Sequence, residues 1–238
     1  MMNENGGGPF RVGLLVPSSN NTMEMDFHRE LPEDIEIATA RMYLPETTKE
    51  AEIVMIDQWL APASRDLETV KPDVTVFGWW WGGSLFGQNY DQGIRRKIEE
   101  ETGSEAVSIL SALSEEFALL GAKKLVVITP YVQVLTDAVR DSLEEDGFEV
   151  LSINGMGITD NLEIGAQSAE AIAGFAEEKI GPALIQEADC LFVSCTNLPA
   201  VRALPEIQAR FPGLPVMTSN LAAVNAVRRR YEKNGGSK

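Results

Sequence analysis

Cys195 is the residue of this 238-residue chain whose surroundings best suit chemistry. It follows a strand-like apolar run that begins at Cys190, and it opens a segment in which Thr196 or Asn197 is a natural helix N-cap and Pro199 suits the first helical turn. This placement puts the thiol beside a predicted helix N-terminus, where partial positive charge stabilises a thiolate. We therefore predict that Cys195 is a catalytic thiol and that Cys190 is a buried structural cysteine.

Three further polar segments have groups that can hold or polarise a substrate. Ser19 and Asn20 follow the first apolar run, and their side chains and backbone N–H groups can bind a carboxylate without a cation. A plain turn followed by a helix cap is the equal alternative. Tyr131 holds the matching place in the second half of the chain, where a phenol can donate to the oxygen of an enediolate. Asp160 and Asn161 form either a helix cap or a substrate contact, and the sequence leaves both open.

A run of tryptophans flanked by glycines forms another candidate segment. Three neighbouring side chains on a strand alternate between its faces, so these indoles cannot all be buried in the same way. We predict that the segment shapes or covers the substrate pocket. The residues assigned to substrate binding are Asn20, Ser19, Trp79, Trp80, Trp81, Gly82, Ser84, Asn161, Thr196 and Asn197.

The elements that must position these residues occur in two similar halves. Four apolar runs recur in the same order: Arg11–Val16 with Lys124–Thr129, Ile35–Thr39 with Phe148–Ser152, Lys71–Phe77 with Glu187–Val193, and Ala106–Leu110 with Pro215–Ser219. The offsets stay between roughly 109 and 116 residues, which is too steady for chance patterning. Asp73 and Asp189 take equivalent places in the third pair. The sequence therefore predicts an internal repeat.

Helical stretches with apolar residues at three- and four-residue spacing separate these runs. They are Ile53–Leu67, Asp91–Glu101, Leu113–Leu120, Leu135–Glu145, Ala166–Ile180 and Leu221–Tyr231. Alternating strands and helices predict an α/β fold with two pseudo-symmetric Rossmann-like lobes, each with a parallel sheet of about four strands flanked by helices. We place the first lobe at 10–112 and the second at 113–219, with a linker near 111–114, and we expect that helix 220–232 can pack back on the first lobe. Ligands of such sheets bind beyond the carboxyl ends of the strands, which places the active site in the cleft between the lobes.

Composition excludes several classes of function. The formal net charge of -16 would repel a phosphate backbone, so we expect no nucleic-acid partner. No apolar run approaches the ~20 residues that span a membrane, and the first residues lack the apolar core of a signal peptide. We therefore expect a cytoplasmic protein, not a periplasmic two-lobe receptor. His28 is the sole histidine, so no metal cluster is expected. A homo-oligomer is compatible with the sequence.

Five motifs occur in the order seen in maleate cis-trans isomerases: Pro17–Asn20, Thr129–Tyr131, Asp160–Asn161, Ser194–Asn197 and Thr218–Asn220. The chain thus resembles the aspartate/glutamate racemase superfamily, which also contains the arylmalonate decarboxylases. The resemblance implies two lobes with the active site between them, a small carboxylate substrate, and no metal or organic cofactor. It also implies that Asn20, Tyr131 and Asn161 contact the substrate, with Tyr131 assisting Cys195 in catalysis.

One loop departs from the pattern of this superfamily. In the isomerases and racemases a second cysteine follows the third strand of the first lobe. The step from Asp73 to Trp79 matches the step from Asp189 to Cys195, so Trp79 stands where that partner thiol would stand. An indole is neither a nucleophile nor a base. Cys195 alone can therefore supply one side of a two-sided proton transfer.

Three functions remain open. The motifs favour a cofactor-independent, maleate-isomerase-like enzyme that acts on a small (di)carboxylic acid through an enediolate or an adduct on Cys195. The absent second thiol favours a decarboxylase of the arylmalonate type, in which a single cysteine donates the proton. The third alternative is a carboxylate-binding protein whose catalysis lapsed with the first cysteine. Turnover by the pure protein separates the two enzymes from the binder.

Overall fold

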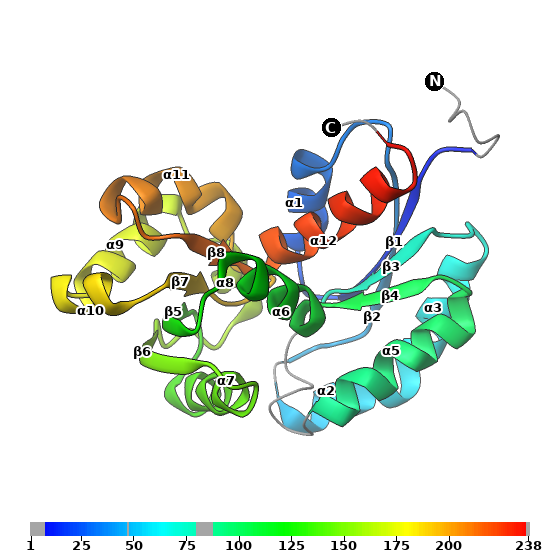
Figure 1. Ribbon diagram of the computed structural model, residues 1–238. Helices are drawn as coiled ribbons and strands as arrows, with labels where there is room; N and C mark the ends of the chain where they lie inside the picture. Colours follow the sequence, from blue (N-terminus) through cyan, green and yellow to red (C-terminus); the bar gives the residue numbers. More distant parts are fainter. Residues whose placement is uncertain (1–7, 47, 80–87, 237–238) are drawn as a thin grey trace.

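The computed structural model describes residues 8–46, 48–79 and 88–236, and it shows two α/β lobes (Figure 1). The elements of the first lobe are β1 (Arg11–Pro17), α1 (Met23–Glu30), β2 (Glu36–Met42), α2 (Lys49–Val54), a π-helical turn (Met55–Trp59), α3 (Leu60–Glu68), β3 (Val74–Phe77), α5 (Gln88–Thr102) and β4 (Glu105–Ser108). Helix α6 (Ile109–Leu120) leads to the second lobe. There follow β5 (Lys124–Thr129), α7 (Gln133–Glu145), β6 (Glu149–Gly155), α8 (Asn161–Gly165), α9 (Ala169–Lys179), α10 (Pro182–Glu187), β7 (Cys190–Val193), α11 (Ala200–Arg210), β8 (Val216–Thr218) and α12 (Ser219–Lys233).

Each lobe is built on a four-stranded parallel sheet. The strand order is β2-β1-β3-β4 in the first sheet and β6-β5-β7-β8 in the second, so the two halves share one topology. The residues of β3 and β7 are all buried, as expected for central strands that helices cover on both faces. The predicted fold class and the predicted repeat are thus confirmed.

The same hydrogen bond, from a backbone N–H to an aspartate carboxylate, links two strands in each lobe. The Asp73 carboxylate accepts the backbone N–H of Arg11 at 2.7 Å, and the Asp189 carboxylate accepts the backbone N–H of Lys124 at 2.8 Å. Each bond ties the start of the third strand of a lobe to the start of its first strand. The backbone bonds hold the Asp189 pKa below its ordinary value, since they stabilise the charged form. The two aspartates are therefore structural equivalents.

The same register relates the loops that follow the third strands. Phe77 forms the last pair between β3 and β1, and Val193 forms the last pair between β7 and β5. Trp79 and Cys195 each lie two residues further along. Trp79 therefore occupies the place in the first lobe that Cys195 occupies in the second.

Helices at two places differ from the sequence expectation. The predicted linker near 111–114 lies inside α6, which begins at Ile109 directly after β4. Ser108 caps this helix, because its hydroxyl accepts the backbone N–H of Ser111. The predicted helix over 166–180 corresponds to α9, which begins three residues later, at Ala169, where Ser168 caps it.

The C-terminal helix α12 returns to the first lobe. It packs against α1, β3 and β4 there, and against α6 between the lobes (Figure 1). Its apolar face is buried, from Ala222 to Tyr231. The last helix of the chain thus covers one side of the sheet that the first residues build.

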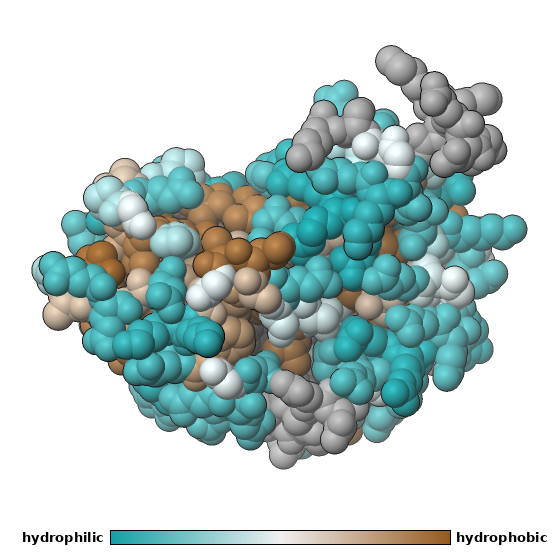
Figure 2. Space-filling model, viewed as in Figure 1, coloured by the Kyte–Doolittle hydropathy of each residue, from teal (hydrophilic) through white to brown (hydrophobic). Residues whose placement is uncertain are grey.

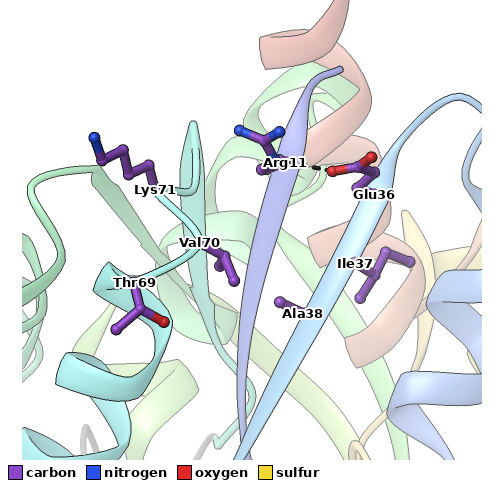
Figure 3. Close-up of a pocket in the computed structure, with 7 residues that line it drawn as sticks. All are labelled: Arg11, Glu36, Ile37, Ala38, Thr69, Val70 and Lys71. Carbon is purple, nitrogen blue, oxygen red and sulfur yellow. Dashed lines mark hydrogen bonds and ion pairs between the residues drawn. The ribbon is translucent and has the colours of Figure 1, made fainter. Parts of the chain in front are cut away.

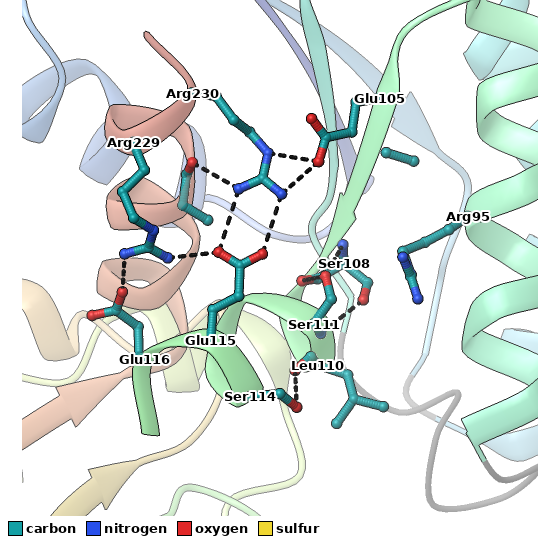
Figure 4. Close-up of polar contacts among 12 residues, drawn as sticks. Arg95, Glu105, Ser108, Leu110, Ser111, Ser114, Glu115, Glu116, Arg229 and Arg230 are labelled. Atoms are coloured by element: carbon teal, nitrogen blue, oxygen red, sulfur yellow. Dashed lines mark hydrogen bonds and ion pairs between the residues drawn. The ribbon is translucent and has the colours of Figure 1, made fainter. Parts of the chain in front are cut away.

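Charged side chains reinforce the contact between α12 and α6 (Figure 4). Arg229 bonds both Glu116 and Glu115, and Arg230 bridges Glu115 to Glu105 at the start of β4. Glu116 is buried and also accepts the Asn225 amide at 2.8 Å. A buried carboxylate needs such partners, so this network is part of the packing of α12.

The outer surface differs between the lobes on the face shown in Figure 2, where hydrophilic side chains cover most of the first lobe and apolar ones gather over the second. Large exposed apolar side chains occur in both lobes, among them Tyr43, Val134 and Leu162. Within the described residues, no helix combines the length and the apolar character that crossing a membrane requires.

We predict that Arg229→Ala destabilises the protein by about 1–3 kcal/mol, because it leaves the buried Glu116 with one neutral donor. Urea unfolding followed by circular dichroism measures this loss. The matched control is Arg96→Ala on the exposed side of α5, for which we expect a change within about 0.5 kcal/mol. Equal effects of the two substitutions would contradict a structural role for the network.

Candidate active site

A small cavity of about 40 Å³ lies between the lobes, at the carboxyl ends of their central strands. Its first-lobe wall consists of Pro17, Asn20, Leu44, Glu52 and Trp79, and its second-lobe wall consists of Tyr131, Asn161, Cys195, Thr196 and Asn197. The structure thus brings together seven residues that the sequence analysis singled out: Asn20, Trp79, Tyr131, Asn161, Cys195, Thr196 and Asn197.

The remaining predicted residues take other places. Ser19 does not line the cavity, but its hydroxyl accepts the Asn161 amide at 2.8 Å. Cys190 is buried inside β7, and His28 is exposed on α1. The predicted substrate contacts Trp80, Trp81, Gly82 and Ser84 lie outside the described residues.

The backbone at Cys195 has an unusual conformation that aims its side chain. Its φ of 106° lies in a region that residues other than glycine rarely adopt, and such strain clusters at functional sites. The Cys195 N–H donates to the Ser219 hydroxyl at 3.1 Å, which fixes this turn. The sulfur accepts the backbone N–H of Asn197 at 3.3 Å and is also bonded by that of Leu198.

The predicted helix cap next to the thiol is wrong. Helix α11 begins at Ala200, with Pro199 at the N-cap position, so neither Thr196 nor Asn197 caps it. In the strained turn at Cys195, the residues that follow the cysteine bend back towards its sulfur. Helix α11 therefore begins only after this turn. Two backbone N–H groups of this turn donate to the sulfur, so they supply the partial positive charge that was expected from a helix N-terminus.

The protonation of Cys195 also differs from the expected thiolate. Burial raises the pKa of this thiol, and hydrogen bonds from Tyr131 and the backbone N–H groups lower it only in part. Burial likewise raises the pKa of Tyr131, to which the nearby sulfur contributes. Both side chains therefore carry their protons at neutral pH, and Cys195 rests as a thiol that is ready to donate.

A hydrogen-bond network joins the two walls of the cavity. The Asn20 amide donates to the Thr196 hydroxyl at 2.9 Å, and that hydroxyl donates to the Gly78 carbonyl at 3.2 Å. Within the second-lobe wall, the Asn197 amide donates to the backbone carbonyl of Asn161 at 2.7 Å. Each amide NH₂ has two hydrogens, and each of these bonds uses one. Each amide therefore has a second hydrogen that these bonds do not use.

Trp79 is held in the wall by the glycine before it. A Cβ on Gly78 would lie 2.5 Å from the Met23 sulfur and 2.9 Å from the Leu15 carbonyl, so only glycine fits here. The Trp79 side chain is buried, and its ring meets that of Phe77 edge to face at 6.2 Å. The indole thus fills, as an apolar group, the place equivalent to the thiol.

Glu52 is a lining residue that the sequence analysis missed. It belongs to α2 and is 2% exposed, and neither of its carboxylate oxygens has a hydrogen-bond partner among the described residues. Burial raises its pKa to about 8. Met55 and Ile56, three and four residues later, are also buried, so helical spacing placed Glu52 on the inner face. That spacing was the available signal, but the predicted helix began at Ile53, four residues after the start of α2, and so left Glu52 out.

The cavity holds few groups that would bind a cation or a cofactor. Its ten lining residues include no lysine, arginine or histidine, so an anionic ligand relies on neutral donors. Within the described part of the chain, no three His, Cys, Asp or Glu side chains gather as metal ligands.

A wider hollow of about 640 Å³ lies at the opposite edge of the first sheet (Figure 3). It is bordered by Arg11 and Glu36, which form an ion pair at 2.9 Å at the start of β1 and β2, and by the turn over 69–71. Ligands of parallel sheets bind beyond the carboxyl ends of the strands. This hollow lies at the opposite ends of the strands, so we do not assign catalysis to it.

The Glu52 carboxyl makes stability depend on pH. Its pKa is raised from 4.5 to about 8. Between these two pH values, the unfolded chain has therefore released a proton that the folded chain keeps. The free energy of unfolding should therefore fall by up to about 1.4 kcal/mol per pH unit across this window. We predict that Glu52→Gln removes this slope, as measured by urea unfolding from about pH 5 to about pH 8. Asp26, whose pKa is raised to about 6, contributes equally to both proteins. An unchanged slope would contradict the burial of a protonated Glu52.

Comparison with known proteins agrees with this architecture. Maleate isomerase from Geobacillus stearothermophilus is 28% identical over 96% of this chain and 96% of its own length. Arylmalonate decarboxylase from Bordetella bronchiseptica is 22% identical over 89% of this chain and 86% of its own.

The fold recurs in a solved structure of the Nocardia farcinica maleate cis-trans isomerase. That protein is a cysteine-to-serine variant with a covalently bound succinylcysteine intermediate, and it superposes with a TM-score of 0.85 at 23% identity, covering 94% of each chain. The sequence pattern of the arylmalonate decarboxylase family matches residues 12–238. This chain therefore belongs to the arylmalonate decarboxylase family.

Proposed function

We propose that this protein is a cofactor-independent, maleate-isomerase-like enzyme that acts on a small mono- or dicarboxylic acid. Cys195 is its catalytic thiol, and the reaction passes through an enediolate or an adduct on this cysteine. Tyr131 assists the thiol, and the amides of Asn20, Asn161 and Asn197 bind the substrate carboxylate. The relatives named maleate isomerase support the isomerase class.

The observation that carries this proposal is the setting of the Cys195 thiol. Its sulfur lines a cavity between the lobes, and Tyr131 and two backbone N–H groups surround it. These donors stabilise a thiolate whenever the proton leaves, while burial keeps the resting group protonated. Preorganised donors of this kind stabilise charge that develops in a transition state. Cys190, which is buried inside β7, does not line this cavity.

A decarboxylase of the arylmalonate type is the second candidate. The observation that favours it is Trp79, which occupies the place equivalent to Cys195 and cannot transfer a proton. A malonate that loses carbon dioxide leaves an enediolate, which needs one proton from one side. The single protonated thiol can supply this proton.

Turnover in deuterated water tests both candidates. The pure protein is incubated with maleate, with aryl- and alkylmalonates and with aspartate and glutamate, and proton NMR follows isomerisation, carbon dioxide loss and deuterium uptake. We expect conversion of at least one acid and a loss of about 10²–10⁴-fold in Cys195→Ala, since the thiol is the proton donor. Cys190→Ala is the matched control and should keep its activity. Binding of these acids without turnover would contradict an enzyme.

A second prediction concerns the place of the missing thiol. Trp79→Cys should create or raise isomerase or racemase activity, because it places a thiol in the first lobe at the position equivalent to Cys195. The same NMR assay measures this gain, and circular dichroism confirms that the variant folds. Trp59→Cys, on an exposed tryptophan, is the control and should show no gain. A folded Trp79→Cys protein with no two-sided exchange would count against the equivalence of the two loops.

A further inference from the structure

Glu52 lies in a setting that packing alone does not explain. It is buried, it lines the cavity, and among the described residues its carboxylate oxygens have no hydrogen-bond partner. Glu116 shows what a structural buried glutamate looks like here, since Arg229 and Asn225 both bond it. An unpartnered buried carboxyl costs stability, so such a group calls for a role in function.

The position of Glu52 relates it to the catalytic thiol. Cys195 belongs to the second-lobe wall of the cavity and Glu52 to the first-lobe wall. The other first-lobe residues of the lining are Pro17, Asn20, Leu44 and Trp79, whose side chains do not exchange protons with a substrate. Among the lining residues of that wall, Glu52 is therefore the group that can serve as an acid or a base.

We propose that Glu52 is a catalytic acid–base group that acts on the substrate from the wall opposite Cys195. This inference rests on the proposed function and deepens it, because it supplies the second proton-transfer group that Trp79 cannot provide. The site then works as a carboxyl–thiol pair.

The proton transfers balance without a further reactant. With an acid that has a hydrogen on the saturated carbon next to its carboxylate, the ionised Glu52 removes that proton, and the C–H electron pair moves into the carboxylate as an enediolate. The S–H bond of Cys195 then breaks, and its proton forms a new C–H bond from the other wall. Glu52 is left protonated and Cys195 ionised. The reverse transfer on a product molecule, or exchange through water, restores both groups, and nothing is oxidised or reduced.

The acidities of the cavity groups suit this assignment. Burial raises the pKa of Glu52 to about 8, and it also raises the pKa of Cys195 above its ordinary value of 9.0. Glu52 therefore loses its proton first and acts as the base while Cys195 remains the acid. Tyr131 is the other titratable group that faces the cavity, and it stays protonated. A base works best when its pKa lies near the working pH.

Glu52→Gln tests the inference with a matched control on the same helix. Glu50→Gln makes the same chemical change on an exposed side chain of α2. Using the acid that the wild-type protein converts fastest, the rates of conversion and of deuterium uptake are measured against pH. We expect the wild-type rate to rise with pH through a midpoint near 8, where Glu52 ionises. Glu52→Gln should lose about 10²–10⁴-fold and this rising limb, while Glu50→Gln should match the wild type.

Glu52→Asp keeps the experiment decisive if the glutamine variant does not fold. It retains a carboxyl group, so it should keep the rising limb with a rate below that of the wild type. A Glu52→Gln protein, or in its place a Glu52→Asp protein, with the wild-type rate and pH profile overturns the inference and leaves the proposed function intact. A wild-type protein that converts and exchanges none of the acids overturns both.

Discussion

The hydrogen bonds of Thr196 hold the two lobes in one arrangement at the cavity. Its hydroxyl accepts from Asn20, which follows β1, and donates to the carbonyl of Gly78, which follows β3. Its backbone carbonyl accepts from Asn220 at the start of α12. One residue beside the Cys195 thiol is thus tied to three segments, two of which belong to the other lobe. Neither lobe alone could form the cavity.

The two lobes share a framework but not a chemistry. Both keep the aspartate that ties the third strand to the first, because each sheet needs this register for itself. The loops after those strands have diverged, with Trp79 in one lobe and Cys195 in the other. The indole fills volume against Phe77, whereas the thiol faces the space between the walls. Glu52 extends this asymmetry, since it comes from a helix of the first lobe.

The strands and their repeat could be predicted because central parallel strands are continuous apolar runs. The site was harder to predict from the sequence, because its contacts join residues that are far apart in the chain. The bond between Asn20 and Thr196 has no trace in local sequence, although both residues were selected as polar groups at strand ends. Local rules also failed at Cys195, where a rare backbone angle prevents the helix cap that Thr196 and Asn197 suggest. Glu52 looked like its exposed neighbour Glu50, because the predicted helix began at Ile53 and so left out the spacing that distinguishes them.

The return of α12 to the first lobe has a consequence for how the chain matures. The ribosome delivers the N-terminal half first, and domains tend to fold in that order during synthesis. Here the helix that covers one side of the first sheet follows the whole second lobe in the sequence, and its apolar residues from Ala222 to Tyr231 are buried. One apolar face of the first lobe therefore stays uncovered until the second lobe and α12 have been synthesised. The core of the first lobe is complete only when α12 has packed against it.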